Sequence, residues 1–183
     1  MLLAHDKSQL LIIDVQEKLL PAMSDQRVVE RCVRLVRAAR TLDVPITLSE
    51  QYPQGLGPTV APIREALGYT GSVMEKVDFS CLKNGALRER LHELRRQGRP
   101  QVIIGGIEAH VCVAQTAIDL EEQGFEAFVV ADAVASRTKA SRRLALARLL
   151  KSGADVVDSE MVVFELLGKA GTPEFKELLA LVK

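Results

Sequence analysis

The 183-residue sequence has no excess of charge of either sign. It contains 24 Lys and Arg residues and 24 Asp and Glu residues, so its formal net charge is zero. A protein that holds a phosphate backbone or an anionic membrane surface needs a net basic face. The balance therefore gives no reason to expect nucleic acid or a membrane as a partner, although it does not exclude a local basic patch.

Cysteines and long apolar runs are also scarce. Cys32, Cys81 and Cys112 are an odd number of thiols without the spacing of a metal site. No apolar run approaches the roughly 18 residues of a membrane helix. The N-terminus shows no basic region followed by a long apolar stretch and a cleavage site. We therefore expect a cytoplasmic protein with reduced thiols.

Motifs for cofactors and metals are missing as well. The first apolar run ends in IDVQEKL without a glycine-rich turn, and the later GGIEAH lacks the spacing of a dinucleotide fingerprint. There is no Walker loop, no HxxH and no CxxC, and His5, His92 and His110 lie far apart in the sequence. We expect neither a cofactor nor a metal.

Short Val-, Ile- and Leu-rich segments alternate with longer segments whose apolar residues recur every three or four positions. The predicted strands cover residues 10–15, 44–48, 73–76, 101–105, 127–131 and 155–157. The predicted helices cover residues 25–42, 84–97 and 111–123, a stretch around 144–150, and two further helices that begin at Ser159 and Thr172. This alternation predicts an α/β fold with a mostly parallel sheet and helices on both faces. The length favours a single domain over residues 1–183.

Three polar residues stand at the ends of predicted strands. Asp14 ends the first strand, Lys76 ends the third, and Cys112 lies where the fourth strand turns into a helix. Taken singly, these residues could be a capping carboxylate, an edge lysine and a small buried side chain. The carboxyl ends of parallel strands meet at one edge of the sheet, however, and ligands bind there.

Together the three residues form a set suited to nucleophilic catalysis. A helix N-terminus and a nearby ammonium both favour a thiolate, so we expect Cys112 to be anionic near neutral pH. The Asp14 carboxylate can accept the thiol proton and later activate water. Backbone N–H groups of the turn GIEAHVC could hold an oxyanion.

These residues lie in stretches that resemble the isochorismatase-like cysteine hydrolases over nearly the full chain, and most closely the isochorismatase-domain-containing branch of unassigned substrate. The matching stretches are LLIIDVQEKL, SEQYPQGLGPT, EKVDFSCL, GGIEAHVCVAQTAIDL, FVVADAVASR and SGADVVDSE. The resemblance implies a six-stranded, Rossmann-like sheet in a three-layer αβα sandwich. It also implies a catalytic trio, which by motif position is Asp14, Lys76 and Cys112.

The resemblance further implies a cis peptide bond between Ile107 and Glu108, with the N–H groups of Glu108 and Cys112 as the oxyanion hole. At two places this chain differs from other members of the superfamily, and both differences limit the class of substrate that we expect. Nicotinamidases of this superfamily bind zinc through an Asp-x-His pair after the second strand, where this chain reads SEQYPQG. True isochorismate hydrolases typically lack the cysteine nucleophile. Cys112 therefore favours an amide, ureido or related acyl substrate.

Four residues are candidates for substrate binding. Glu50 and Tyr52 lie in the long loop over the expected cleft, Phe79 follows the third strand, and His110 precedes the nucleophile by two residues. Asp132 and Arg137 are better candidates for a structural ion pair or an interface contact.

The sequence thus predicts a hydrolase that cleaves a small amide-like or acyl substrate through a thioester, without metal or cofactor. Two alternatives remain open. The fold could serve assembly, binding or redox sensing without catalysis, or the chain could cleave an ether bond of an isochorismate-type acid. The resemblance also implies a homo-oligomer.

Overall fold

The computed structural model describes residues 1–182 and contains one six-stranded sheet. All neighbouring strands are parallel, in the order β3-β2-β1-β4-β5-β6. The strands are β1 (Ser8–Ile13), β2 (Ile46–Gln51), β3 (Ser72–Lys76), β4 (Gln101–Ile107), β5 (Glu126–Ala135) and β6 (Asp155–Val157). The predicted α/β fold with a parallel sheet is confirmed.

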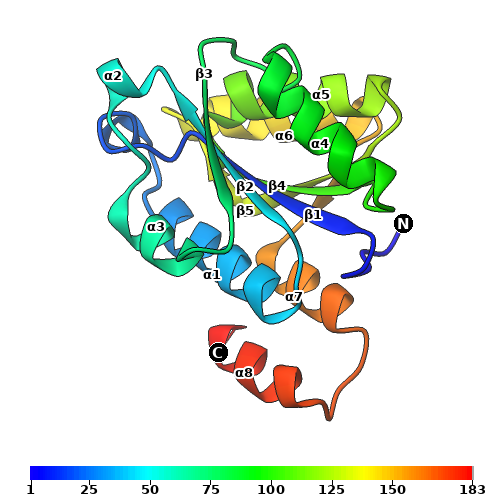
Figure 1. The fold of residues 1–183 in the computed structure, drawn as a ribbon. Coiled ribbons are helices and arrows are strands. Elements are labelled where there is room, and N and C mark those ends of the chain that lie inside the picture. The colour runs from blue at the N-terminus through cyan, green and yellow to red at the C-terminus, as the bar shows by residue number, and fades with distance from the viewer. Residues whose placement is uncertain (183) are drawn as a thin grey trace.

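Helices cover both faces of this sheet, which gives three layers (Figure 1). The α-helices are α1 (Val28–Thr41), α2 (Pro53–Leu56), α3 (Ala61–Leu67), α4 (Gly85–Arg96), α5 (Ala114–Glu122), α6 (Lys139–Lys151), α7 (Ser159–Leu167) and α8 (Pro173–Val182). A 3₁₀ turn, η1 (Leu20–Ala22), and a π-helical turn, η2 (Ala109–Val113), complete the set. None of the helices in residues 1–182 is long and apolar enough to cross a membrane.

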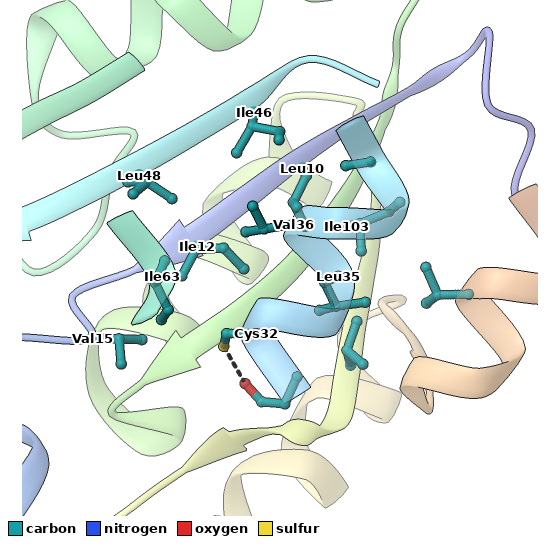
Figure 2. Close-up of a cluster of buried hydrophobic side chains, with 14 of the residues drawn as sticks. Leu10, Ile12, Val15, Cys32, Leu35, Val36, Ile46, Leu48, Ile63 and Ile103 are labelled. Carbon is teal, nitrogen blue, oxygen red and sulfur yellow. Dashed lines mark hydrogen bonds between the residues drawn. The ribbon is translucent and has the colours of Figure 1, made fainter. Parts of the chain in front are cut away.

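Alternation along the strands divides the core into two halves. In β1, Leu10 and Ile12 pack with α1, α3 and α7, whereas Leu11 and Ile13 pack with α4, α5 and α6. Figure 2 shows the first half, where α1 lies across the strands and the Cys32 thiol reaches a backbone carbonyl. Because both faces are buried, the strands carry the near-continuous apolar runs that the sequence shows.

Five of the six strands have boundaries that differ from the prediction, and two of these differences bear on the site. The first strand was predicted to cover residues 10–15 but ends at Ile13, because Asp14 has a φ of 54° and leaves the extended conformation. The second was predicted to cover residues 44–48 but continues to Gln51, which is paired with Lys76 of β3. Both shifts bring polar residues to the carboxyl edge of the sheet.

Gly106 is required where β4 approaches β1. Its φ is +121°, and a Cβ atom there would lie 2.1 Å from the carbonyl oxygen of Ile13. We therefore expect Gly106→Ala to lower the free energy of unfolding by about 3 kcal/mol or more, through backbone strain and overpacking. Urea unfolding measures this loss. Gly85→Ala is the matched control, because no atom lies within 4 Å of its added Cβ; equal losses in both variants would contradict the prediction.

Candidate active site

The candidate site lies at the carboxyl edge of the sheet, where the order of the strands reverses. The chain proceeds from β1 outward to β2 and β3, then returns to place β4 on the other side of β1. Figure 1 shows this edge on the side where α2 follows β2. Such a reversal opens a crevice in which α/β proteins bind ligands.

Asp14 follows β1 directly and is completely buried. Its Oδ1 accepts a hydrogen bond of 2.7 Å from the Ser49 hydroxyl, and its Oδ2 accepts one of 2.7 Å from the Lys76 ammonium. The register explains both contacts, because Ile13 is paired with Ser49, and Lys76 ends the strand beyond β2. The carboxylate is thus held from two neighbouring strands.

Lys76 has several acceptors and almost no contact with solvent. Besides Asp14, its Nζ donates to the Gln51 side-chain oxygen at 2.6 Å and to the carbonyl oxygens of Asp78 and Phe79 at 3.1 and 3.3 Å. Burial disfavours the ammonium, but the interactions that favour it, of which the charge of Asp14 is the largest, together outweigh burial, so the pKa of Lys76 lies above its ordinary value. Lys76 is therefore a cation at neutral pH.

Cys112 lies in η2, the π-helical turn that leads from β4 into α5. The N–H groups of Val111 and Val113 both donate to the Glu108 carbonyl, which winds the turn one residue wider than an α-helix. The helical segment thus begins at Ala109, earlier than the predicted residues 111–123, and its first turn is π-helical rather than α-helical. Cys112 is 5% exposed, and the charges of both Asp14 and Lys76 act on its thiol. The structure therefore brings Asp14, Lys76 and Cys112 together.

The electrostatics of the site correct one expectation. Burial, and then the charge of Asp14, raise the pKa of the Cys112 thiol to about 12, and Lys76 only partly opposes this. Burial also raises the pKa of Asp14, against the lowering effect of Lys76 and of the hydrogen bonds. The expectation of a Cys112 thiolate near neutral pH is therefore wrong for the resting site. Cys112 rests as a thiol beside a buried carboxylate that has enhanced basicity.

The peptide bond between Ile107 and Glu108 is cis, as the resemblance implied. The Glu108 carboxylate binds the Arg137 guanidinium through three contacts of 3.0–3.2 Å. Arg137 is therefore not the ion-pair partner of Asp132, whose carboxylate accepts hydrogen bonds from the backbone and hydroxyl of Ser159. The Glu108–Arg137 pair anchors the segment that precedes Cys112.

The four candidate substrate residues occupy different environments. Tyr52 and Phe79 are each 55% exposed, and both belong to segments bonded to Lys76: the Tyr52 N–H donates to the Lys76 carbonyl, and the Phe79 carbonyl accepts from Nζ. Glu50 is instead buried, with its carboxylate 2.6 Å from the Thr59 N–H, so it fastens the loop. His110 is exposed and bonds to the Ser136 hydroxyl.

Two other observations bear on the position of the site. No group of three or more His, Cys, Asp or Glu side chains within residues 1–182 is arranged to hold a metal ion. A groove of about 930 Å³ between the N-terminal segment and α7 contains none of the three residues and no thiol. The site is therefore located by its chemistry rather than by the size of a cavity.

Two further residues contribute to the site and were not predicted from the sequence. Ser49 bonds to Asp14, and Gln16 is completely buried and bonded to the backbone of Gln51. The two-residue spacing from Asp14 to Gln16 could not reveal this contact, because Asp14 leaves the extended conformation in which alternate side chains share a face.

A family model described as the isochorismatase domain matches residues 8–161. Isochorismatase domain-containing protein 2 from Bos taurus is 41% identical over 180 residues, which cover 96% of this chain and 83% of that protein. The protein of the same name from Danio rerio is 42% identical over 178 residues, covering 96% and 86%.

Solved structures agree with this relationship. MAR1 ribonuclease from Caenorhabditis elegans has a TM-score of 0.92 and 35% identity, covering 100% of this chain and 92% of that one. YcaC from Pseudomonas aeruginosa, solved with hexane-2,5-diol and covalent acrylamide, has a TM-score of 0.89 and 25% identity, covering 98% and 91%. The chain therefore belongs to the isochorismatase-like hydrolase family.

Proposed function

We propose that the protein hydrolyses a small amide-like or acyl substrate by nucleophilic attack of Cys112. The proximity of the Cys112 thiol to the buried Asp14–Lys76 ion pair carries this proposal. Asp14 takes the thiol proton as sulfur attacks the carbonyl carbon, so the thiolate exists only while the bond forms. The N–H groups of Glu108 and Cys112 hold the oxyanion that develops.

The remaining steps return the site to its starting state. The tetrahedral intermediate collapses, the C–N bond breaks, and the proton held by Asp14 passes to the departing amine. Asp14 then takes a proton from water, whose oxygen attacks the thioester; the acid leaves and the sulfur regains its proton. Lys76 keeps its proton throughout and stabilises the carboxylate form of Asp14.

An uncharged substrate with an apolar substituent fits the edge of the site best. Asp14 and Lys76 already neutralise each other, and Glu108 is neutralised by Arg137. Three exposed side chains in the segments bonded to Lys76 are apolar or aromatic: Tyr52, Val77 and Phe79. The charges of the trio and of Glu108 are thus paired, and Tyr52 and Phe79 can pack against an aliphatic or aromatic group of the substrate.

The test uses a panel of uncharged aliphatic and aromatic amides with hydroxylamine as a competing nucleophile. We expect the wild type to release ammonia or amine and to form a hydroxamate, because hydroxylamine intercepts the thioester. Cys112→Ala should lower both rates by at least about a thousandfold, as loss of a covalent nucleophile does. Cys32→Ala is the control, because this buried thiol lies in the opposite half of the core. Equal hydrolysis by Cys112→Ala and wild type would refute the mechanism.

Cleavage of RNA is a second candidate, because a structure 35% identical to this chain is named a ribonuclease. Helix α6 carries five basic residues and no acidic one, and it packs against η2. The completely buried Asp14 and the nearly buried Cys112 are accessible to a small carbonyl compound rather than to a strand of RNA. Incubation with labelled RNA in the presence of a chelator separates the candidates, since Cys112-dependent cleavage would favour the ribonuclease.

A further inference from the structure

Two glutamines join the ends of β1 and β2 beside the site. The Gln16 side chain accepts a hydrogen bond of 2.7 Å from the Gln51 N–H and donates one of 3.0 Å to the Gln51 carbonyl. It also donates to the Gly57 carbonyl at 2.6 Å. Every polar atom of this buried side chain is therefore engaged, and the backbone of Gln51 is held from both sides.

Only one orientation of the Gln51 side-chain amide allows both its oxygen and its nitrogen to form hydrogen bonds. Its Nε2 donates to the Val77 carbonyl at 2.8 Å, which turns Oε1 toward Lys76, 2.6 Å from Nζ. The reversed amide would direct N–H groups at an ammonium and a carbonyl oxygen at a carbonyl oxygen. The amide dipole is thus fixed with its negative end on the Lys76 cation.

We infer that Gln51 is a positioning residue that keeps Lys76 protonated and directed at Asp14, and that Gln16 holds Gln51 in register for this role. The inference rests on the proposed function, because it explains how the partner of the general base is kept charged. It requires no contact between Gln51 and the substrate.

Counting hydrogen bonds supports this role. An ammonium has three N–H groups, and Lys76 directs them at Asp14, Gln51 and the carbonyls of Asp78 and Phe79. A neutral amine has only two N–H groups and would direct a lone pair at one of these oxygens. The side chain is completely buried, so water cannot replace a missing acceptor. Removal of the Gln51 oxygen therefore penalises the charged form.

The other titratable groups near Lys76 are Asp14 after β1, Cys81 in the β3–α4 connection and Cys112 in η2. Cys81 and Cys112 are both thiols at neutral pH, because burial raises the pKa of Cys81 to about 11 and that of Cys112 to about 12. Asp14 is therefore the one anion among these neighbours, and Gln51 supplies the closest uncharged acceptor.

The experiment follows the titration of Lys76 by the ¹³Cε chemical shift in the full-length protein labelled with ¹³C-lysine, with Lys76→Arg used for assignment. Gln51→Met preserves the length of the side chain but removes the acceptor. We expect it to lower the titration midpoint of Lys76 by about one pH unit or more, the size of one lost hydrogen bond to a buried charge. Gln54→Met is the matched control, because Gln54 is exposed and bonds only to Glu75.

Gln51→Glu is expected to have the opposite effect on the titration midpoint of Lys76. It also provides a second test if Gln51→Met does not fold. Its carboxylate restores an acceptor, so the midpoint of Lys76 should equal or exceed that of the wild type. The new carboxylate also competes with Asp14 for the Lys76 ammonium. The rate at which an alkylating reagent modifies Cys112 rises with pH, and we expect this rise to occur at higher pH in Gln51→Glu than in the wild type. An unchanged midpoint in Gln51→Met, or a lowered one in Gln51→Glu, would overturn the inference. These readouts need no substrate, so they stand even if no amide is hydrolysed.

Discussion

Replacing Asp14 with Asn is expected to slow hydrolysis strongly and at the same time to make Cys112 more acidic. The amide keeps the shape of the carboxylate and can still accept from Ser49 or Lys76, but it cannot take the thiol proton. Loss of a general base lowers the rate by about 10²–10⁴-fold. The charge of Asp14 is also a cause of the high pKa of Cys112, whereas Lys76 lowers it. Without the carboxylate, a Cys112 thiolate becomes the natural partner of the Lys76 ammonium.

The ultraviolet absorbance of the thiolate measures this change directly. We expect the pKa of Cys112 to fall from about 12 by at least about one unit, because one unit corresponds to only 1.36 kcal/mol of charge interaction. Subtracting the titration of the Asp14→Asn/Cys112→Ala double variant isolates the signal. Asp119→Asn is the control, since Asp119 bonds to Ser80 and Lys83 rather than to the site. A raised or unchanged pKa in Asp14→Asn would refute the described electrostatics.

The positions of the trio could be predicted because parallel strands impose them. A short apolar run in the sequence predicts a buried strand, and the first polar residue after that run lies at the carboxyl edge of the sheet. Asp14 follows this rule, since it comes directly after β1, whereas Lys76 is the last residue of β3, an edge strand in which exposed Val73 and Glu75 alternate with less exposed residues. Only the order of the strands decides whether such ends are neighbours, and the alternation of elements does not specify that order.

The properties that depend on side-chain packing could not be predicted. A helix N-terminus and a lysine suggested a thiolate, but burial and the adjacent carboxylate outweigh both at Cys112. The sequence predicts that Glu50 lies in a long loop and meets the substrate, but Glu50 belongs to β2 and its carboxylate accepts from the Thr59 N–H. The hydrogen bonds between Gln16 and Gln51 depend on the register between β1 and β2. A slip of one residue would turn the side chains of one strand to the other face of the sheet and break these bonds.

Replacing Lys76 with Met should destabilise the fold strongly and in a manner that depends on pH. The variant leaves the Asp14 carboxylate buried without its cation, and breaking a buried pair in this way costs about 3–5 kcal/mol. Burial already raises the pKa of Asp14 above its unfolded value, and loss of Lys76 raises it further. A group with a raised folded pKa favours the fold below its unfolded pKa, and that contribution is lost as pH rises through the folded pKa. The loss in Lys76→Met should therefore be large at about pH 8 and shrink toward about pH 4.

Urea unfolding of wild type and variant across this pH range tests the expectation. Lys83→Met is the control, because its side chain is 67% exposed and its ion pair with Asp119 is worth at most about 1 kcal/mol. Adding Asp14→Asn to Lys76→Met removes the stranded charge, so the double variant should be more stable at about pH 8 than Lys76→Met alone. A loss that is the same at every pH, or a double variant that is no better than the single one, would mean that Lys76 contributes by packing. In that case the Lys76 ammonium would not be what keeps Asp14 ionised and so able to take the proton from Cys112.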